Sequence, residues 1–413
     1  MWGEALNSFQ IEHQCPQCGA PANLEETDRL FTCPFCRVKS LLLSGDYFRY
    51  VLPAKNPARK ELIYLPYWRF KGLLLFSLPA GNDHKFIDVN QRAAEIPGMP
   101  ITLGLRAQAI KLKFAAPDME GSFIPPARPF PEIFTEFQKR LSQALPKPLL
   151  YCAHLGESMG MLYAPFYANG RLYDALLDKP VGNLPAKLSG GVFKESKPTW
   201  RVQFVPALCP DCGWDLEGQR DTLVLHCGNC KASWYPSGQK LTRVESFALH
   251  TPEKEAYQLP FWQITCNITE ISLKTYADLV RIANLPVVVR GSFEKREFRF
   301  WLPAFKLRAR AFLRLAESLT LIQAQEMLEP SLPAGRHHPV TLPVEEVCES
   351  LKVVLAGFLK PRRKVAELLT AITIQPTHFR LAYLPFAEDQ HDYLQPHTQL
   401  AINKNMLNLS GNL

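Results

Sequence analysis

The stretch CPQCGAPANLEETDRLFTCPFC, residues 15–36, decides the local fold, and it recurs as CPDCGWDLEGQRDTLVLHCGNC at residues 209–230. Both segments follow the pattern C-x2-C-x14-C-x2-C. Two residues between cysteines allow a tight turn to aim both sulfurs at one ion, and two such turns complete the four-sulfur shell that zinc prefers. We predict two zinc ions per chain, with these ligands: Cys15, Cys18, Cys33, Cys36, Cys209, Cys212, Cys227 and Cys230.

Gly19 and Gly213 follow the first turn of each segment, at a position that favours a residue tolerant of positive φ. With these turns, the two segments resemble the zinc-ribbon superfamily of four-cysteine, rubredoxin-like sites. The resemblance covers roughly 30 residues in each half and implies a structural metal site. It identifies no full-length family, because zinc ribbons occur in transcription, translation, replication and adaptor proteins. Iron is the alternative metal, and the resemblance favours zinc because rubredoxin-like iron sites usually have a longer central loop.

The two halves also match outside the cysteines. The separation that relates Cys15 to Cys209 also relates Leu-Pro-Tyr-Trp at 65–68 to Leu-Pro-Phe-Trp at 259–262. Tryptophan occurs only seven times in the chain, so chance is a poor explanation. The other matching pairs are Lys-Glu at 60–61 and 254–255, Leu-Arg-Ala at 105–107 and 307–309, and Tyr-x-Pro-Phe at 163–166 and 383–386. The sequence therefore predicts a tandem duplication.

Each half is predicted to be a zinc ribbon followed by an α+β domain of about 150 residues, with helices packed on antiparallel sheet. The predicted order is ribbon 1 over 1–48, α+β domain 1 over 49–186, a linker over 187–202, ribbon 2 over 203–243 and α+β domain 2 over 244–413.

Hydrophobic periodicity and turn residues predict several elements of these domains. Asn169-Gly170 fits a type I′ turn between two strands. We expect the aromatic residues of the Leu-Pro-aromatic-Trp segments to fill the core rather than to form a binding surface. The other expected elements are a strand over 65–76, paired strands at 287–289 and 298–301, and helices starting at Pro131, at Pro343 and near Ala304.

The search for catalytic residues finds one motif, Gly-Glu-Ser-Met-Gly at 156–160, which matches the G-x-S-x-G elbow of hydrolases. That elbow needs a helix after the serine, whereas a hairpin is predicted here, so a hydrolase using Ser158 is the least favoured hypothesis. A shell of four cysteines leaves no open position for substrate, so we predict that the protein is not an enzyme. Cys152, Cys266 and Cys348 have no metal-like spacing and are expected in the core.

Charge gives two opposing indications about partners. The formal net charge of +8 is calculated with neutral thiols. Eight thiolates that bind two zinc(II) ions would halve this net charge. Lys306, Arg310 and Arg314 are spaced to share one helix face, and with the basic cluster at 362–364 they could bind phosphates. Acidic residues within the ribbons would instead repel a nucleic-acid backbone and suit a basic protein: Glu25, Glu26 and Asp28 in the first, and Asp215, Glu217 and Asp221 in the second.

Composition is that of a globular protein, with 47% hydrophobic and 21% charged residues. The first fifteen residues contain no secretory signal, and no apolar stretch is long enough to span a bilayer. We therefore expect a cytoplasmic, zinc-binding protein that is not inserted in a membrane and acts as a protein-interaction adaptor or scaffold. The alternative is a nucleic-acid-binding accessory factor related to transcription or replication. The oligomeric state stays open.

Overall fold

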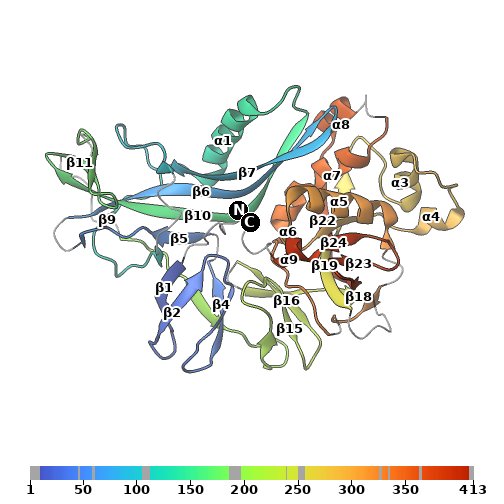
Figure 1. The fold of residues 1–413 in the computed structure, drawn as a ribbon, viewed down its shortest axis with the longest axis horizontal. Coiled ribbons are helices and arrows are strands. Elements are labelled where there is room, and N and C mark those ends of the chain that lie inside the picture. The colour runs from blue at the N-terminus through green and yellow to red at the C-terminus, as the bar shows by residue number, and fades with distance from the viewer. Residues whose placement is uncertain are drawn as a thin grey trace. The chain divides into compact units, whose positions relative to one another are not determined.

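The computed structural model describes residues 10–44, 47–57, 61–104, 112–185, 197–238, 240–249, 256–324, 328–333, 335–361 and 365–408. The chain forms two compact units (Figure 1). Unit 1 contains residues 1–71, 87–144 and 158–207, and unit 2 contains residues 72–86, 145–157 and 208–413. Strands predominate over helices in the described residues. None of the helices described there is both long and apolar enough to cross a membrane.

Unit 1 is built mainly of strands. Three of them, β6, β7 and β10, continue into residues assigned to unit 2. The elements are β1 Gln10–Gln14, β2 Pro21–Glu25, β3 Leu30–Thr32, β4 Lys39–Leu43, β5 Phe48–Val51, β6 Ile63–Leu78, β7 Gly81–Arg92, β8 Leu112–Phe114, β9 Ser122–Phe123, α1 Phe130–Ala144, β10 Tyr151–Asn169, β11 Arg171–Asp174, β12 Lys179–Gly182 and β13 Gln203–Pro206.

The main sheet of unit 1 has the order β12-β11-β10-β5-β8-β1-β2, and β6 pairs with β10, β7 and β9. Its ladders are mixed: β1 and β2 are antiparallel, whereas β1 and β8 are parallel. A smaller sheet has the order β13-β4-β3. Helix α1 lies along β7 and β6 (Figure 1), and Phe70 of β6 stacks on Phe134 and Phe137 of α1. The apolar face of the helix therefore covers the sheet, as its spacing predicts.

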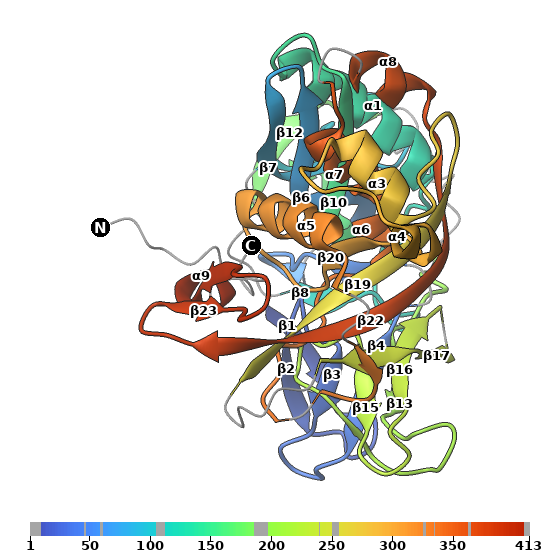
Figure 2. The ribbon, with the colours of Figure 1, turned by 90° about the vertical axis from the view of Figure 1, so that its right-hand side faces the viewer.

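Unit 2 contains most of the helices (Figure 2). The elements are β14 Leu216–Glu217, β15 Leu225–Cys227, β16 Ser233–Ser237, β17 Lys240–Val244, β18 Ser246–Ala248, β19 Tyr257–Ile268, α3 Tyr276–Ala283, α4 Gly291–Lys295, β20 Phe300–Pro303, α5 Ala309–Ile322, β21 Glu329–Pro330, α6 Val344–Glu349, α7 Leu351–Phe358, α8 Val365–Ala371, β22 Ile374–Glu388, β23 Asp392–Leu394, β24 Ala401–Asn403 and α9 Lys404–Asn408.

The main sheet of unit 2 has the order β20-β19-β22-β18-β21, and a second sheet has the order β14-β15-β16-β17. Helix α5 packs against β20 and α7. The core between sheet and helices includes Trp262, Trp301, Phe312 and Phe386, all with 0% exposure. The expected combination of several sheets with packed helices is thus present, although parallel pairs such as β18 with β22 accompany the antiparallel ones.

The Leu-Pro-aromatic-Trp segments lie in the cores, as predicted. Trp68 in β6 donates its Nε1–H to the carbonyl of Arg128 at 3.0 Å, and Arg128 closely precedes α1. Trp262 in β19 donates in the same way to Leu342 at 2.9 Å, shortly before α6. A buried indole N–H must find an acceptor, so each tryptophan ties the start of a helix to the central strand.

Three local predictions are wrong. Residues 287–289 form no strand; they belong to the connection before α4, where Val287 and Val288 are exposed. The hairpin of β10 and β11 is present, but only Gly170 has a positive φ angle, +64°, so the turn is not type I′. Helix α5 begins at Ala309 rather than near Ala304, because the Ala304 carbonyl already accepts the N–H groups of Thr341 and Leu342. The helices starting at Pro131 and Pro343 are confirmed, the latter interrupted at Ser350.

Replacing Trp262 by Phe should lower the free energy of unfolding by about 2 kcal/mol, because the buried carbonyl of Leu342 loses its donor. Urea unfolding followed by circular dichroism would measure this. The control is Trp214→Phe, since Trp214 is 58% exposed and should change stability by less than about 0.5 kcal/mol. Equal stabilities of the two variants would contradict the role given to Trp262.

Candidate metal centres

The eight cysteines lie in the turns of short β-hairpins. Cys15 and Cys18 lie between β1 and β2, and Cys33 and Cys36 lie between β3 and β4. In the second set, Cys227 ends β15 and Cys230 lies between β15 and β16, and the first turn is closed by a bridge between Leu208 and Asp215. From their strands and turns, ribbon 1 is defined as residues 10–43 and ribbon 2 as residues 208–244.

One backbone arrangement recurs in all four turns. The first cysteine donates its N–H to a carbonyl five positions later, and its own carbonyl accepts the N–H of the residue four positions later. The carbonyls that accept are those of Ala20, Val38, Trp214 and Ala232. The residues four positions later all have left-handed φ angles: Gly19 at +73°, Arg37 at +61°, Gly213 at +73° and Lys231 at +60°. The glycines were predicted for this role; Arg37 and Lys231 were missed, although aligning the four turns places them at the same position.

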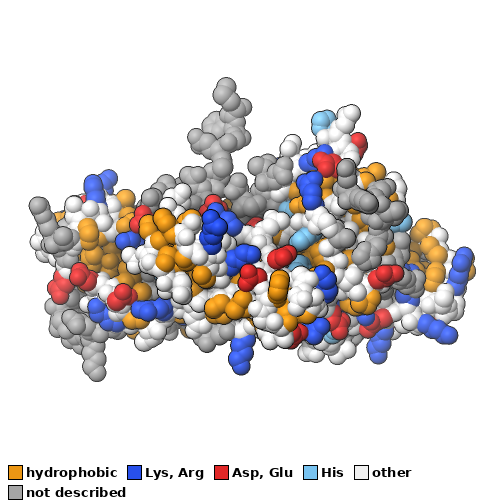
Figure 3. Space-filling model, turned by 90° about the horizontal axis from the view of Figure 1, so that it is seen from below, with side chains coloured by type: hydrophobic (Ala, Val, Ile, Leu, Met, Phe, Trp, Pro, Cys, Tyr) orange, Lys and Arg blue, Asp and Glu red, His pale blue; other side chains and the backbone are white. Residues whose placement is uncertain are grey.

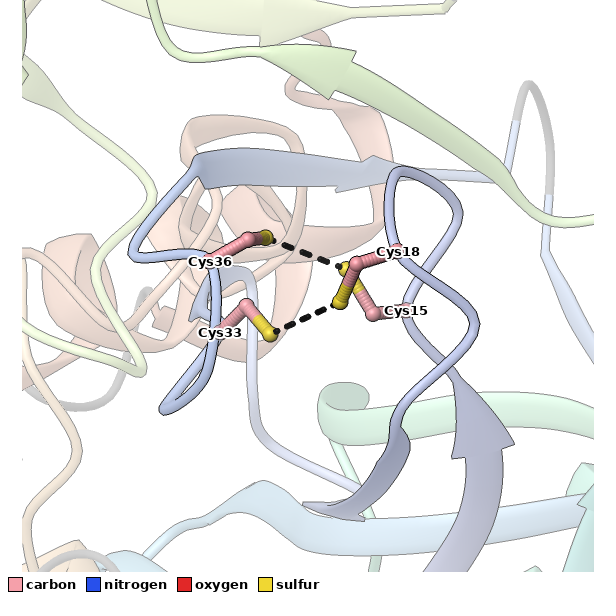
Figure 4. Close-up of side chains that lie close together, drawn as sticks. All are labelled: Cys15, Cys18, Cys33 and Cys36. Carbon is pink, nitrogen blue, oxygen red and sulfur yellow. Dashed lines mark hydrogen bonds between the residues drawn. The ribbon is translucent and has the colours of Figure 1, made fainter.

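The sulfur geometry fits a tetrahedral ion. In ribbon 1 the Sγ atoms of Cys15 and Cys36 are 3.8 Å apart, and those of Cys18 and Cys33 are 3.7 Å apart (Figure 4). In ribbon 2 the corresponding distances are 3.6 Å and 3.5 Å. All four Sγ atoms of each set lie within 4.8 Å of one another. A regular tetrahedron with zinc–sulfur bonds of about 2.3 Å has edges of about 3.8 Å, so both sets match a four-thiolate zinc shell.

The ligands differ in exposure in a regular way. The first cysteine of each turn is buried, whereas Cys18, Cys212 and Cys230 are exposed and Cys36 is half-buried. Backbone N–H groups of Cys36 and Phe35 lower the pKa of the Cys33 thiol to about 6. The N–H of Trp214 and the side chain of Asn229 lower the pKa of Cys212 to about 6. Thiolates are the metal-binding form, so these donors prepare one cysteine of each set for an ion.

Ribbon 1 is attached to β6 by a buried ion pair that the sequence did not reveal. Arg69 donates from Nη1 to both oxygens of Glu26, at 2.7 and 2.9 Å, and from Nε to Asp88 at 3.1 Å. Asp28 is also buried and accepts the N–H of Glu25 at 2.8 Å. The expectation that the acidic residues of ribbon 1 are available to a basic protein is therefore wrong for Glu26 and Asp28, which are buried in contacts within the unit. In ribbon 2, Asp215 and Glu217 are exposed as expected.

Ribbon 2 is attached to its unit by neutral groups. His226 in β15 contacts the Ser233 hydroxyl through Nδ1 at 2.9 Å and the Tyr383 hydroxyl of β22 through Nε2 at 2.8 Å. Burial, with a smaller contribution from His337, lowers the pKa of His226 to about 3. The imidazole is therefore neutral at physiological pH and serves as a buried hydrogen-bonding link.

The remaining candidates do not form a site. Lys306 precedes α5 and is buried, so it shares no helix face with Arg310 and Arg314, and the basic cluster at 362–364 lies outside the described residues. Residues 156–160 lie within the continuous strand β10, which lacks the strand-to-helix turn of a nucleophile elbow. Cys152, Cys266 and Cys348 are half-buried rather than fully buried.

Comparison with known proteins gives no relative: no family model, no curated protein and no solved structure matches this chain.

Native mass spectrometry of the purified protein should find two zinc ions per chain, and Cys212→Ser should retain one. The residual shell of three thiolates binds more weakly, and metal binding is coupled to folding of the ribbon. Hydrogen exchange should accordingly rise over ribbon 2 and stay unchanged over ribbon 1. Cys266→Ser is the control, because Cys266 lies outside both shells and should leave both ions bound. Two tightly bound ions in Cys212→Ser, or iron in the wild type, would contradict this assignment.

Gly213→Ala should destabilise ribbon 2 by about 1 kcal/mol, because alanine disfavours the φ angle of +73° while its Cβ meets no atom within 4 Å. Lys231→Gly should hardly change the stability of ribbon 2. Glycine relieves the strain of the left-handed φ angle, and this gain offsets the greater conformational freedom of glycine in the unfolded chain. Thermal unfolding of the zinc-loaded protein would measure both changes. Gly228→Ala is the control, because Gly228 has no left-handed φ angle. A loss of stability in Gly228→Ala as large as that in Gly213→Ala would show that crowding around the added Cβ, rather than the φ angle, causes the destabilisation.

Proposed function

We propose that this protein is a non-enzymatic, zinc-stabilised protein-interaction adaptor in which two structural metal shells hold the ribbons in shape. The observation that carries the proposal is the presence of exposed apolar side chains beside both shells: Phe35 is 67% exposed, Trp214 58% and Leu208 47%. Exposed apolar side chains that lie next to one another mark interaction sites, and tryptophan is among the residues most enriched at binding hot spots. Sulfur ligands that fill all four positions give the metal no place for a substrate.

Ribbon 2 offers the better-defined surface. Leu208 and Trp214 flank the first turn and are held together by it, because the N–H of Cys209 donates to the Trp214 carbonyl at 2.7 Å. Asp215 and Glu217 are exposed beside them. An apolar anchor with an acidic rim suits a basic protein segment, since the rim steers the partner and the anchor supplies the affinity.

Nucleic-acid binding receives less support. Of the three predicted helix cations, Lys306 is buried, and Arg314 donates to the Ala401 carbonyl at 2.6 Å. The face seen in Figure 3 carries Lys, Arg, Asp and Glu side chains interspersed, without a broad basic field. Phosphate backbones need several cations gathered on one surface.

We further infer that the chain arose by tandem duplication. Support comes from hydrogen bonds to the prolines of the two matching Leu-Pro-aromatic-Trp segments. Ala93 donates to the Pro66 carbonyl at 2.9 Å, and Ala304 donates to that of Pro260 at 3.0 Å. The tryptophan bonds to the chain before α1 and α6 form a second matching pair.

Strand pairing supports the same inference. Leu52 donates to the Tyr163 carbonyl and Leu249 to that of Tyr383, each at 3.0 Å. Both tyrosines belong to the matching Tyr-x-Pro-Phe segments. In each half a short strand, β5 or β18, runs parallel to the long strand β10 or β22 and antiparallel to a third strand, β8 or β21. Unrelated domains seldom share both the direction and the register of such ladders.

Replacing Leu208 and Trp214 together by Ser should abolish recovery of the partner in affinity purification from the native cell, because the apolar anchor is lost. Ile101→Ser is the matched control: Ile101 is 60% exposed in unit 1 and lies outside both ribbons. Its partners should equal those of the wild type.

The competing function predicts a different result. Fluorescence anisotropy with labelled single- and double-stranded DNA and RNA should detect no binding at low salt. Tight binding that weakens steeply with added salt would favour a nucleic-acid-binding factor and contradict the adaptor.

A further inference from the structure

The two halves differ most at one connection. In unit 2, β19 and β20 are joined by residues 269–299, which contain α3 and α4. Their counterparts β6 and β7 are joined by Pro79 and Ala80 alone. The hydrogen bonds from Ala93 to Pro66 and from Ala304 to Pro260 indicate that β6 corresponds to β19 and β7 to β20. Residues 269–299 are therefore an insertion in one half, and insertions within repeated units often carry the binding function.

The insertion is an ordered framework. Thr275 and Asp278 form a capping box at the start of α3, and Asn284 ends the helix with a φ angle of +50°. Helix α4 packs on α3, where Phe293 and Tyr276 meet edge to face with ring centroids 4.8 Å apart. These contacts fix the connection between the two helices, so a partner would meet a surface that is already shaped.

The tip between α3 and α4 is apolar and unprotected. Val288 is 82% exposed and Val287 45% exposed. Three consecutive valines favour a strand, yet among the described residues no strand pairs with 285–290. Local preference and structure disagree here, and such disagreements in natural proteins concentrate at functional positions.

The rim of the tip is basic. Arg290 directly follows the valines and is exposed, and Lys295, which is also exposed, is the last residue of α4. The nearby carboxylate of Glu294 already pairs with Arg281 at 2.5 Å. The tip therefore presents two exposed apolar side chains followed in the chain by the exposed cation Arg290, with Lys295 at the far end of α4. The connection between α3 and α4 lies at the right-hand edge of Figure 1, the side of the chain that faces the viewer in Figure 2.

We propose that residues 286–290, the tip of this insertion, form a docking site for a protein partner that offers an apolar pocket edged by carboxylates. The site rests on the proposed adaptor function and is distinct from the surface at Trp214 in its charge. A second copy of this chain fits poorly, because a symmetric contact would bring Arg290 and Lys295 against their own images. A lipid surface fits poorly too, because membrane-binding segments insert Trp, Phe or Leu, and this tip offers only valines.

The test places a photo-crosslinking amino acid at position 288 of the full-length protein, in its native cell, and the same group at position 214. Proteins crosslinked at position 288 are identified and purified. Their dissociation constants are then measured for the wild type, for the double variant Val287→Ser with Val288→Ser, for Arg290→Glu and for the control Ile101→Ser. Thermal unfolding of each variant checks that the fold is retained, which surface substitutions should allow.

The double valine variant should bind at least about tenfold more weakly, as expected for losing the burial of an apolar side chain. Arg290→Glu should also weaken binding, by a factor that shrinks as salt is added. Ile101→Ser should bind like the wild type.

Four results would overturn the site. They are unchanged affinity of the double valine variant, crosslinking at position 214 but not at 288, a 288-to-288 crosslink between two copies, and valine-dependent binding to phosphatidylserine vesicles instead of a protein. The first two leave the adaptor function intact. Absence of any partner at both positions would remove the adaptor function as well.

Discussion

The approach of four cysteine sulfurs to within 4.8 Å of one another is the constraint on which the turns of both ribbons depend. It requires two turns that each present two sulfurs on one side, and the turns achieve this through one residue in the left-handed region. That conformation costs a non-glycine residue about 1 kcal/mol, which is small beside the free energy of a four-thiolate zinc site. A metal ion bound by the four thiolates would therefore offset the cost of the left-handed conformation of Arg37 and Lys231. The strands of the ribbons are short for the same reason, because each pair of cysteines lies in a turn that joins two strands of a hairpin.

The ribbons are held on their units by contacts of different chemistry. Ribbon 1 relies on the buried pair of Arg69 and Glu26, in which the attraction must offset the loss of hydration of two charges. Ribbon 2 relies on the neutral link from His226 to Tyr383, which carries no such cost. Arg69 also pairs with Asp88 at 3.1 Å, so one guanidinium on β6 joins Glu26 of ribbon 1 to Asp88 of β7. The neutral link from His226 to Tyr383 specifies the position of ribbon 2 only through the directions of its hydrogen bonds.

The sequence allowed the two clusters of four cysteines, the turn glycines, the buried tryptophans and the starts of two helices to be predicted, because each depends on local spacing or on a residue with few alternatives. It did not allow the roles of Glu26 and Arg69 to be predicted, since a buried ion pair between distant positions has no local pattern. The prediction that Lys306 lies on a basic helix face is wrong for a similar reason. The N–H groups of Thr341 and Leu342 donate to the Ala304 carbonyl, and the helix begins only after Lys306. The three valines at 287–289 suggested a strand, but a strand needs a neighbour, and propensity does not provide one.

The two cysteine clusters have the same turn geometry, although the contacts around them differ. Ribbon 1 continues the main sheet of unit 1 through the pairing of β1 with β8 and is joined to β6 by Glu26 and Arg69, whereas ribbon 2 is joined to β22 by His226 and Tyr383. Hydrogen bonds from Ala93 to Pro66 and from Ala304 to Pro260 fix the ends of the central strands. The connections between these strands can therefore differ in length, as Pro79–Ala80 and residues 269–299 do. Surfaces such as Trp214 and Val288, present in one half only, could change at little cost to folding. The cysteine turns and the Leu-Pro-aromatic-Trp strands thus match where the fold requires them, whereas Trp214 and Val288 are exposed.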